Sequence, residues 1–341
     1  MLNTRILKPA DEAHSTPLLI KNLLLTGQRY EPTQEIIYRD LVRYDYRTFN
    51  ERVCRAADAL TKAGVKAGDT VAMMDWDSHR YLECMFAVPM IGAVMHTINV
   101  RLSPDQILYT MNHAEDIVVL INSEFVPIYK AIEDQLTTVT TTILLTDEED
   151  KTADLPGLAG EYEQLLAAAE PTYDFPDFDE NSVATTFYTT GTTGLPKGAQ
   201  LTNDNFRALF SVVEWQMDAD TRNMAVMPLF HIAGSGWALF GMGSGATTIM
   251  TREFDPVAAL KLIEDEKVTH AIFVPAILQF FLMVPSDGID LTSMELIVYG
   301  ASPITQDVLV KSMEQFGCEY MQVYGLTETT GVVTQLDPAD H

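Results

Sequence analysis

The chain has 341 residues, of which 47% are hydrophobic and 21% are charged. This composition supports a sizeable buried core and excludes a disordered or fibrous chain. With 22 basic and 48 acidic residues, the formal net charge is −26, and such a field opposes binding to nucleic acid or anionic lipid, although a local basic pocket could still bind phosphate.

At roughly 150 residues per domain, the length predicts about two domains. The first residues, Met1 to Pro9, lack the apolar stretch of a secretory signal peptide. The three cysteines, Cys54, Cys84 and Cys318, are widely spaced and odd in number, which argues against a disulfide framework or a cysteine metal site. We therefore expect reduced thiols and a cytoplasmic location.

The first clear helix and strand signals lie in residues 48–74. Thr48 and Glu51 form a capping-box pattern, T-x-x-E, ahead of apolar residues at helical spacing. Gly64 stands where the glycine that ends a helix belongs. The apolar run at residues 70–74 follows and predicts a buried strand.

A second capping box follows in the next part of the chain. It consists of Ser103 and Gln106, with Pro104 at the first helical position. After the helix that these residues predict, the apolar runs at residues 117–121 and 143–145 predict two further strands.

Residues 147–181 interrupt this alternation. The segment is acidic, contains three prolines, and lacks sustained periodicity outside a short helix expected near residues 162–169. These features are typical of a surface connection. We therefore divide the chain into a first α/β subdomain, residues 1–180, and a second α/β portion, residues 181–341.

A loop rich in glycine and threonine follows a strand expected at residues 184–187. Its sequence is Tyr188-Thr189-Thr190-Gly191-Thr192-Thr193-Gly194-Leu195-Pro196-Lys197-Gly198. The glycines let backbone N–H groups approach a ligand, and the hydroxyls and the lysine add donors, which suits polyphosphate. It is not a Walker A loop, because Pro196 precedes Lys197 and Gly198 follows it. By itself the pattern leaves open a plain solvated turn.

The stretch between Arg222 and Arg252 carries no formal charge apart from His231, if that residue is protonated. A membrane span should be mostly large and apolar over about 20 residues. This stretch instead contains Pro228, five glycines and several Ser and Thr residues. We therefore expect a buried strand, loop, helix and strand inside a soluble fold, and no transmembrane segment.

The remainder of the chain alternates helix and strand signals. Expected in order are a helix beginning at Asp255-Pro256, strands at residues 270–274 and 296–299, a helix that opens at Ser302-Pro303 and ends near Gly317, and a strand at residues 319–324. Such alternation predicts an α/β fold with mainly parallel sheets flanked by helices. Ligands in these folds gather at the carboxyl ends of the strands.

Four segments, in this order, resemble the motifs of the acyl-adenylate-forming (AMP-binding) superfamily. They are the loop at 188–198, Met227-Pro228-Leu229-Phe230-His231-Ile232-Ala233-Gly234, Tyr299-Gly300-Ala301-Ser302-Pro303, and Tyr324-Gly325-Leu326-Thr327-Glu328-Thr329. The loop departs from the family pattern Tyr-Thr-Ser-Gly-Thr-Thr-Gly-x-Pro-Lys-Gly only at Thr190, which keeps the hydroxyl. Residues 96–104 and 112–116 look most like the fatty acyl-CoA synthetase branch. The resemblance covers essentially the whole chain and implies two stacked α/β subdomains.

In this family a carboxylate attacks the α-phosphate of ATP to give an acyl adenylate and pyrophosphate, and a thiol, usually that of coenzyme A, then takes the acyl group. The resemblance implies that Thr189, Thr190, Gly191, Thr192, Thr193, Gly194 and Lys197 hold the β- and γ-phosphates. It implies that Gly300, Ala301, Ser302, Pro303, Tyr324 and Gly325 surround adenine. Thr327 would bond the α-phosphate, and Glu328 would hold Mg²⁺, which prefers carboxylate and phosphate oxygens. The expected catalytic residues are Lys197, His231, Thr327 and Glu328.

The same resemblance implies an apolar acyl pocket formed by His231, Trp237 and Phe240. We expect the ring of His231 to separate the nucleotide from the acyl group, and we assign it no proton transfer. Residues around Phe280, Phe281 and Met283 could also line the pocket, although a plain core helix is the favoured interpretation. Each buried CH₂ of an acyl chain contributes roughly 0.8 kcal/mol, but the sequence does not locate the end of the pocket.

The resemblance is to the large N-terminal domain alone. The family's ribose-binding aspartate, its hinge and its small C-terminal domain with the adenylation lysine have no counterpart before His341. We therefore expect the chain to be the N-terminal part of a longer protein. By itself it should have weak or no ligase activity, with residual binding of nucleotide or acyl adenylate.

The leading hypothesis is a medium- or long-chain fatty acyl-CoA synthetase that uses ATP, Mg²⁺ and coenzyme A. Two alternatives stay open: an aryl- or short-chain-acid CoA ligase of the same family, and a nonenzymatic module that binds nucleotide or acyl adenylate. A carrier protein could replace coenzyme A as the thiol. The residues do not decide whether the protein forms a homodimer.

Overall fold

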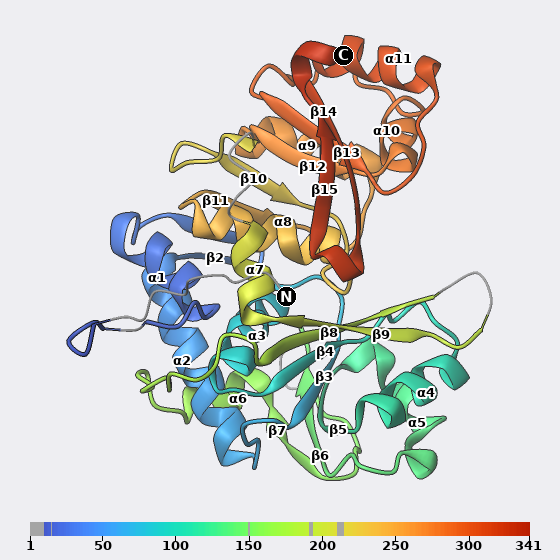
Figure 1. Ribbon diagram of the computed structural model, residues 1–341. Coiled ribbons are helices and arrows are strands. Elements are labelled where there is room, and N and C mark those ends of the chain that lie inside the picture. Colours follow the sequence, from blue (N-terminus) through green and yellow to red (C-terminus); the bar gives the residue numbers. More distant parts are fainter. Residues whose placement is uncertain (1–9, 15, 149–150, 191–193, 210–214) are drawn as a thin grey trace, which may run out of the picture.

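The computed structural model describes residues 10–14, 16–148, 151–190, 194–209 and 215–341 (Figure 1). Within them, strands and helices alternate along the chain and form two mixed, mainly parallel sheets with helices packed around them. The predicted α/β fold class is therefore confirmed. No helix in the described part of the chain is long and apolar enough to span a bilayer.

The first sheet has the strand order β7-β6-β5-β3-β4-β8-β9. All neighbours run parallel except β8 and β9, which form an antiparallel hairpin. Its strands are β3 (Thr70–Met74), β4 (Val94–Thr97), β5 (Asp116–Asn122), β6 (Thr141–Leu145), β7 (Leu158–Glu161), β8 (Val183–Thr189) and β9 (Lys197–Thr202).

The second sheet has the order β15-β14-β13-β12-β10-β11-β1-β2. Only the two edge strands, β2 and β15, pair antiparallel. Its strands are β1 (Glu35–Tyr38), β2 (Val42–Asp45), β10 (Arg222–Ala225), β11 (Thr247–Met250), β12 (His270–Phe273), β13 (Leu296–Gly300), β14 (Glu319–Leu326) and β15 (Gly331–Leu336). In Figure 1 the two sheets form the lower and upper halves of the molecule.

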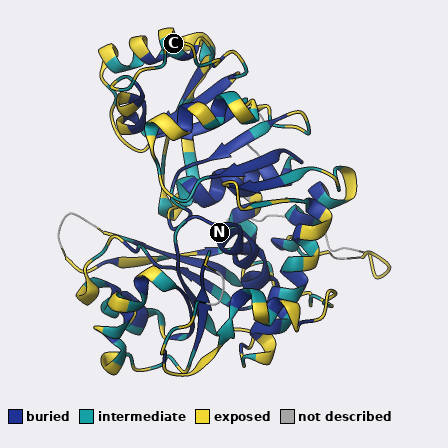
Figure 2. Cartoon of the chain, turned by 180° about the vertical axis from the view of Figure 1, so that it is seen from behind, coloured by how far each residue is buried: buried dark blue, intermediate teal, exposed yellow. Residues whose placement is uncertain are grey.

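The helices connect the strands and cover the sheets. They are α1 (Lys21–Tyr30), α2 (Tyr46–Lys62), α3 (His79–Met90), α4 (Pro104–Ala114), α5 (Val126–Lys130), α6 (Tyr162–Ala167), α7 (Asn203–Leu209), α8 (Ile232–Gly243), α9 (Pro256–Glu266), α10 (Pro275–Phe281) and α11 (Gln306–Phe316). Every residue of α3 is buried, and α8 is buried from Gly234 to its end. The outward faces of the peripheral helices are exposed (Figure 2).

Helix α8 lies between the two hydrophobic cores. Its residues Ala238, Leu239 and Met242 belong to the core around the first sheet. Trp237 and Phe240 belong to the core of the second sheet. This position explains why the helix carries no charged residue, since from Gly234 onward it is buried all round.

Several predicted element boundaries are confirmed. Ser103 and Gln106 form the capping box of α4, with reciprocal hydrogen bonds of 3.4 and 3.3 Å, and Pro104 is its first residue. Asp255 caps α9, and Gly317 ends α11 in the left-handed conformation. The uncharged stretch between Arg222 and Arg252 forms β10, a loop, α8 and β11, as expected.

Two helix starts differ from the prediction. Helix α2 begins at Tyr46, and its cap is Asp45, whose side chain accepts a 2.8 Å hydrogen bond from the Thr48 amide. Thr48 therefore lies in the first turn, because β2 runs directly into the helix and leaves Asp45 at the junction. Helix α11 begins at Gln306 rather than near Ser302, because the preceding residues form an irregular loop with Ala301 at a positive φ of 64°.

The segment expected as a surface connection also contains an unpredicted strand, β7, on the edge of the first sheet. Neither sheet ends at the proposed boundary after residue 180. Strands β8 and β9 lie beyond that boundary but extend the first sheet, whereas β1 and β2 lie before it but belong to the second. The division into subdomains at residue 180 stays a prediction.

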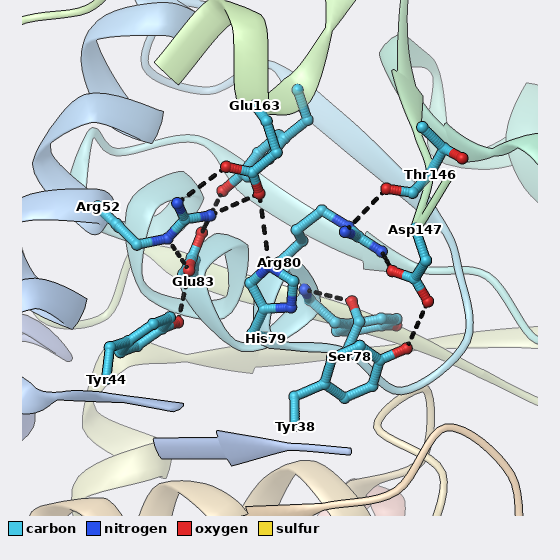
Figure 3. A network of polar contacts seen from close by, with 12 residues as sticks. Tyr38, Tyr44, Arg52, Ser78, His79, Arg80, Glu83, Thr146, Asp147 and Glu163 are labelled. Atoms are coloured by element: carbon cyan, nitrogen blue, oxygen red, sulfur yellow. Dashed lines mark hydrogen bonds and ion pairs between the residues drawn. The ribbon is translucent and has the colours of Figure 1, made fainter. Parts of the chain in front are cut away.

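A network of polar contacts joins the N-terminal strands of the second sheet to the helices around the first (Figure 3). The fully buried carboxylate of Glu83, on α3, accepts hydrogen bonds from Tyr44 and Arg52 at 2.6 Å each. Arg52 also pairs with Glu163 of α6 at 2.7 Å. Since a buried charge is costly unless it is paired and hydrogen-bonded, these contacts favour one specific arrangement of β2, α2, α3 and α6.

A second set of contacts in Figure 3 centres on Asp147, which follows β6. Its carboxylate accepts hydrogen bonds from Arg80 at 2.6 Å and from the Tyr38 hydroxyl at 3.1 Å. Tyr38 ends β1, whereas Arg80 lies in the first turn of α3. Asp147 therefore connects the second sheet to the carboxyl edge of the first.

Candidate functional site

The candidate site is a cavity of about 550 Å³ where strands of the second sheet end. Its walls come from the ends of β12, β13 and β14, from the start of α8 and of β15, and from the end of β8 in the first sheet. The lining residues are Thr189, Trp215, Met227, His231, Ile232, Ala233, Gly236, Trp237, Ile272, Phe273, Val274, Gly300, Ala301, Val323, Gly325, Leu326, Thr327, Glu328, Gly331 and Val332. The volume is within the range of small-molecule sites.

One wall of the cavity is aromatic. The Trp237 side chain is 1% exposed, and its indole N–H donates a 3.2 Å hydrogen bond to the backbone carbonyl of Met224. Trp215 packs against it with ring centroids 5.1 Å apart. Phe240 does not line the cavity but supports this wall from behind, with its ring 4.7 Å from that of Trp215. This wall can bind an apolar group.

His231 stands at the start of α8, beside the cavity. The residue is exposed to solvent, and its ring contacts Phe230, with centroids 4.7 Å apart. The Arg101 guanidinium lies over the ring of Phe230, 5.9 Å from its centroid. Burial by surrounding atoms, together with the charge of Arg101, lowers the pKa of His231. Both effects favour the neutral imidazole, which can pack as an aromatic ring.

A second wall is built from polar and glycine-rich turns. Thr327 and Glu328 lie in a short 3-10 helix, η4 (Thr327–Thr329), between β14 and β15. The Thr329 hydroxyl lies 3.0 Å from the Leu326 carbonyl oxygen and 2.8 Å from that of Gly331, and its single proton can be donated to either one, which ties this turn together. Gly325 allows the close approach of the two strands, because a Cβ there would lie 1.7 Å from the Gly331 oxygen.

Strand β13 ends at this wall in Gly300, and Ala301 follows it. Ala301 has a left-handed backbone conformation, with φ of 64°, which costs an L-residue other than glycine roughly 1–2 kcal/mol. Such strain is tolerated mainly where the surrounding structure imposes it, and it concentrates at functional sites. Ser302 and Pro303 are exposed and do not line the cavity. The same is true of Tyr324, which is 61% exposed on β14.

The glycine- and threonine-rich segment links β8 to β9, and the hairpin base, which is the Thr189–Lys197 pair beside that segment, reaches the cavity through Thr189. Thr189 lines the cavity and pairs with Lys197 across the two strands. Thr190, Gly194 and Lys197 are exposed. The remaining predicted phosphate-binding residues, Gly191, Thr192 and Thr193, lie outside the described residues.

Two charged side chains of the predicted site have no ion-pair partner among the described residues. They are Lys197, at the hairpin base, and Glu328, in η4. Within the same residues, no group of three or more His, Cys, Asp or Glu side chains is arranged to hold a metal ion. Mg²⁺ is usually bound through one or two carboxylates together with substrate phosphates, and Glu328 suits such a shared site.

The structure thus brings Thr189, His231, Trp237, Gly300, Ala301, Gly325, Thr327 and Glu328 to one cavity. Residues 272–274 line it without having been predicted, although the rule that ligands bind at strand carboxyl ends would have pointed to them. Trp215 had no sequence signal. Phe280 and Met283 are exposed outside the cavity, whereas Phe281 is buried in the core. The core-helix interpretation therefore holds for Phe281 and not for the other two residues.

Comparison with known proteins adds a family to this geometry. The family model described as "AMP-binding enzyme" matches residues 26–341. The 3-methylmercaptopropionyl-CoA ligase of Ruegeria lacuscaerulensis is 31% identical over 335 residues, which cover 93% of this chain and 61% of that protein. The medium-chain-fatty-acid–CoA ligase of Ectopseudomonas oleovorans is 30% identical, with 95% and 61% covered. The chain thus spans about three fifths of the length of these relatives.

A similar solved structure is the inhibitor-bound N-terminal domain of FACL13 from Mycobacterium tuberculosis. It superposes with a TM-score of 0.84 at 27% identity and covers 94% of this chain and 79% of that one. The match is to an N-terminal domain, in agreement with the extent predicted from the motifs.

Proposed function

The chain belongs to the family of AMP-binding enzymes, and on that premise we propose that it forms the nucleotide- and acid-binding part of an AMP-forming acid–CoA ligase. One observation carries the proposal: a single cavity has an aromatic wall at Trp215 and Trp237 and a polar wall at Thr327 and Glu328. An acyl adenylate has this division, because it joins an apolar acyl group to a charged nucleotide.

In the proposed reaction, an oxygen of the substrate carboxylate forms a bond to the α-phosphorus of ATP. The bond from that phosphorus to the bridging oxygen breaks, and pyrophosphate leaves with the electron pair. The chain's own residues would position the reactants and neutralise charge, which is the main contribution of proteins to phosphoryl chemistry. The thiol of coenzyme A would then displace AMP from the acyl group.

Each site residue has a proposed role in this scheme. Lys197 and Thr189, at the hairpin base, would bind the β- and γ-phosphates, and Thr327 would donate a hydrogen bond to the α-phosphate. Glu328 would hold Mg²⁺, which supplies additional positive charge to the phosphates. The neutral ring of His231 would pack between the nucleotide and the acyl group.

For the acid we propose a fatty acid whose chain packs against the aromatic wall. A second candidate is a short-chain or aryl acid. The two buried indoles of Trp215 and Trp237 favour it, because bulky rings in the cavity wall leave less room for a long chain. The relatives named above include ligases for a medium-chain fatty acid and for a sulfur-containing propionate, so both candidates occur among similar proteins.

The test is thermal stabilisation of the chain by nonhydrolysable acyl-adenylate analogues with acyl groups of two to eighteen carbons and with an aryl group. A ligand that binds only the folded state stabilises it by about 2.7 kcal/mol at one hundred times its Kd. We expect stabilisation that depends on the acyl group. His231→Ala should weaken it, whereas His231→Phe, which keeps a ring, should largely preserve it.

Lys197→Ala provides the second comparison, measured with ATP, and Lys66→Ala is its matched control. Lys66 is an exposed lysine in the turn before β3, at the amino edge of the first sheet and away from the cavity. We expect only the Lys197 variant to lose affinity for ATP. Absence of stabilisation by every analogue and by ATP would contradict the proposed function.

A further inference from the structure

Tyr188 is the last residue of β8 before the Thr189–Lys197 pair, and its side chain is held from two directions. The ring is nearly fully buried, and Tyr188 belongs to the cross-strand pair next to the hairpin base. It contacts a buried histidine on one side and forms a hydrogen bond with a surface histidine on the other. None of the roles proposed above uses these residues.

On the buried side, Tyr188 contacts a histidine–aspartate pair. His96, on β4, has its ring centroid 4.9 Å from that of Tyr188. Its Nδ1 lies 2.8 and 3.0 Å from the two carboxylate oxygens of Asp116, the first residue of β5. Both side chains are fully buried. Because the carboxylate fixes the orientation of the imidazole, the surface against which Tyr188 packs is rigid.

On the solvent side, the Tyr188 hydroxyl lies 2.7 Å from Nδ1 of His113. His113 is in the last turn of α4, and its ring also stacks on Tyr109 of the same helix, with centroids 5.4 Å apart. Burial, reinforced by the charge of Asp116, raises the pKa of Tyr188. The phenol therefore keeps its proton at neutral pH and can donate a hydrogen bond to Nδ1 of His113.

The ring of Tyr188 also contacts the strand opposite. Gly198 pairs with Tyr188 across the hairpin, and a Cβ at Gly198 would lie 3.2 Å from the Tyr188 Cζ atom. The backbone of β9 therefore rests directly on the ring. One residue further along, Thr189 and Lys197 form the next cross-strand pair. A shift of the Tyr188 ring would consequently displace both residues.

We propose that Tyr188 and His113 are positioning residues, which fix the Thr189–Lys197 pair and thereby set the affinity of the site for the β- and γ-phosphates of a nucleoside triphosphate. This inference rests on the function proposed above. It goes further because contacts from α4 and β4, in the first sheet and its helices, would set the binding of the β- and γ-phosphates and of no other part of the ligand. Groups bound elsewhere in the cavity should be insensitive to these two residues.

The test compares two ligands on the 341-residue chain: ATP, and an acyl-sulfamoyl adenosine, which has no β- or γ-phosphate. Tyr188→Phe keeps the ring and removes the hydroxyl, and His113→Ala removes its partner. We expect each variant to raise the Kd for ATP by about threefold to tenfold, the worth of one hydrogen bond, and to leave the Kd for the acyl-sulfamoyl adenosine unchanged.

Two further variants separate positioning from simple loss of stability. The double variant Tyr188→Phe/His113→Ala should bind ATP no more weakly than either single variant, because both remove the same interaction. His113→Asn should restore ATP affinity, since the amide oxygen can take the place of Nδ1 as acceptor. Tyr173→Phe is the matched control: it removes a tyrosine hydroxyl bonded to Thr61 at 3.0 Å, far from the hairpin.

The outcomes distinguish this inference from the function on which it rests. If the unaltered chain binds neither ligand, both are wrong. If it binds both ligands and the variants weaken neither, or weaken both equally, the positioning role is wrong and the proposed function stands. His113 is on the surface, so His113→Ala and His113→Asn carry the test even if Tyr188→Phe fails to fold.

Discussion

At the scale of single residues, Glu163 shows how a partly exposed carboxylate is tied into the structure. Burial disfavours its charged form, but hydrogen bonds from His79 and Arg52 outweigh burial and lower its pKa to about 2. The ordinary value for glutamate is about 4.3. Because the folded state favours the ionised group, its contribution to stability is present above about pH 4.3 and is lost as the pH falls toward 2.

We therefore predict that Glu163→Gln lowers the free energy of unfolding at pH 6, and that its difference from the unaltered chain shrinks between about pH 4.5 and 2. Urea unfolding followed at several pH values measures this. Glu51→Gln is the control, since Glu51 forms only a surface pair with Arg55 one helical turn away, and such pairs contribute little. A difference for Glu163→Gln that is constant with pH would refute the assignment.

At the scale of elements, the ends of α4 have separate roles. Its first turn is capped by Ser103, whereas His113 in its last turn contacts the hairpin base. Ser103→Ala removes the capping oxygen and should lower the free energy of unfolding by about 1 kcal/mol. Chemical denaturation measures this change. We expect ATP affinity to stay the same, because the opposite end of the helix is unaltered.

Ser286→Ala is the matched control for this prediction. Ser286 lies in the loop after α10 and caps no helix, so its replacement should change stability much less. If Ser103→Ala lowered ATP affinity while leaving the free energy of unfolding unchanged, the separation of roles along α4 would be wrong.

Element prediction from the sequence worked where the signal was local. The capping box at Ser103, the cap at Asp255 and the helix end at Gly317 are each set by residues within one turn. It failed where a neighbouring element decided the boundary. Asp45 caps α2 because β2 ends there, and β7 is a strand because the edge of β6 offers it backbone partners.

At the scale of the whole molecule, the net charge of −26 should govern the response to salt. Charge of one sign destabilises the compact state by self-repulsion, and salt screens it over about 10 Å at 0.1 M. Screening also weakens surface ion pairs, but these are individually worth at most about 1 kcal/mol. We therefore predict that Tm rises when KCl is raised from about 0.01 M to about 0.5 M.

Differential scanning calorimetry measures this shift. Chloride is the appropriate anion, because sulfate would also strengthen apolar burial and confound the result. A Tm that falls with added KCl would mean that the ion pairs, including the networks of Figure 3, outweigh the repulsion.

The sequence by itself determined the α/β class, the order of most strands and helices, and the four motif segments that assign the family. These depend on periodicity, caps and short residue patterns, which are local properties of the chain. The family resemblance carried by those segments implied Thr189, His231, Thr327 and Glu328 as site candidates, and the cavity contains all four.

Only the tertiary structure decided how distant segments meet. Residues 36–38 pair with residues 248–250 in the second sheet, Trp215 completes the aromatic wall, and His113 reaches Tyr188 from another element. The tertiary structure also put Phe240 behind that wall and Tyr324 outside the cavity. Such contacts arise from packing between residues far apart in the chain, for which local periodicity carries no information, since it reports only which face of each element is apolar.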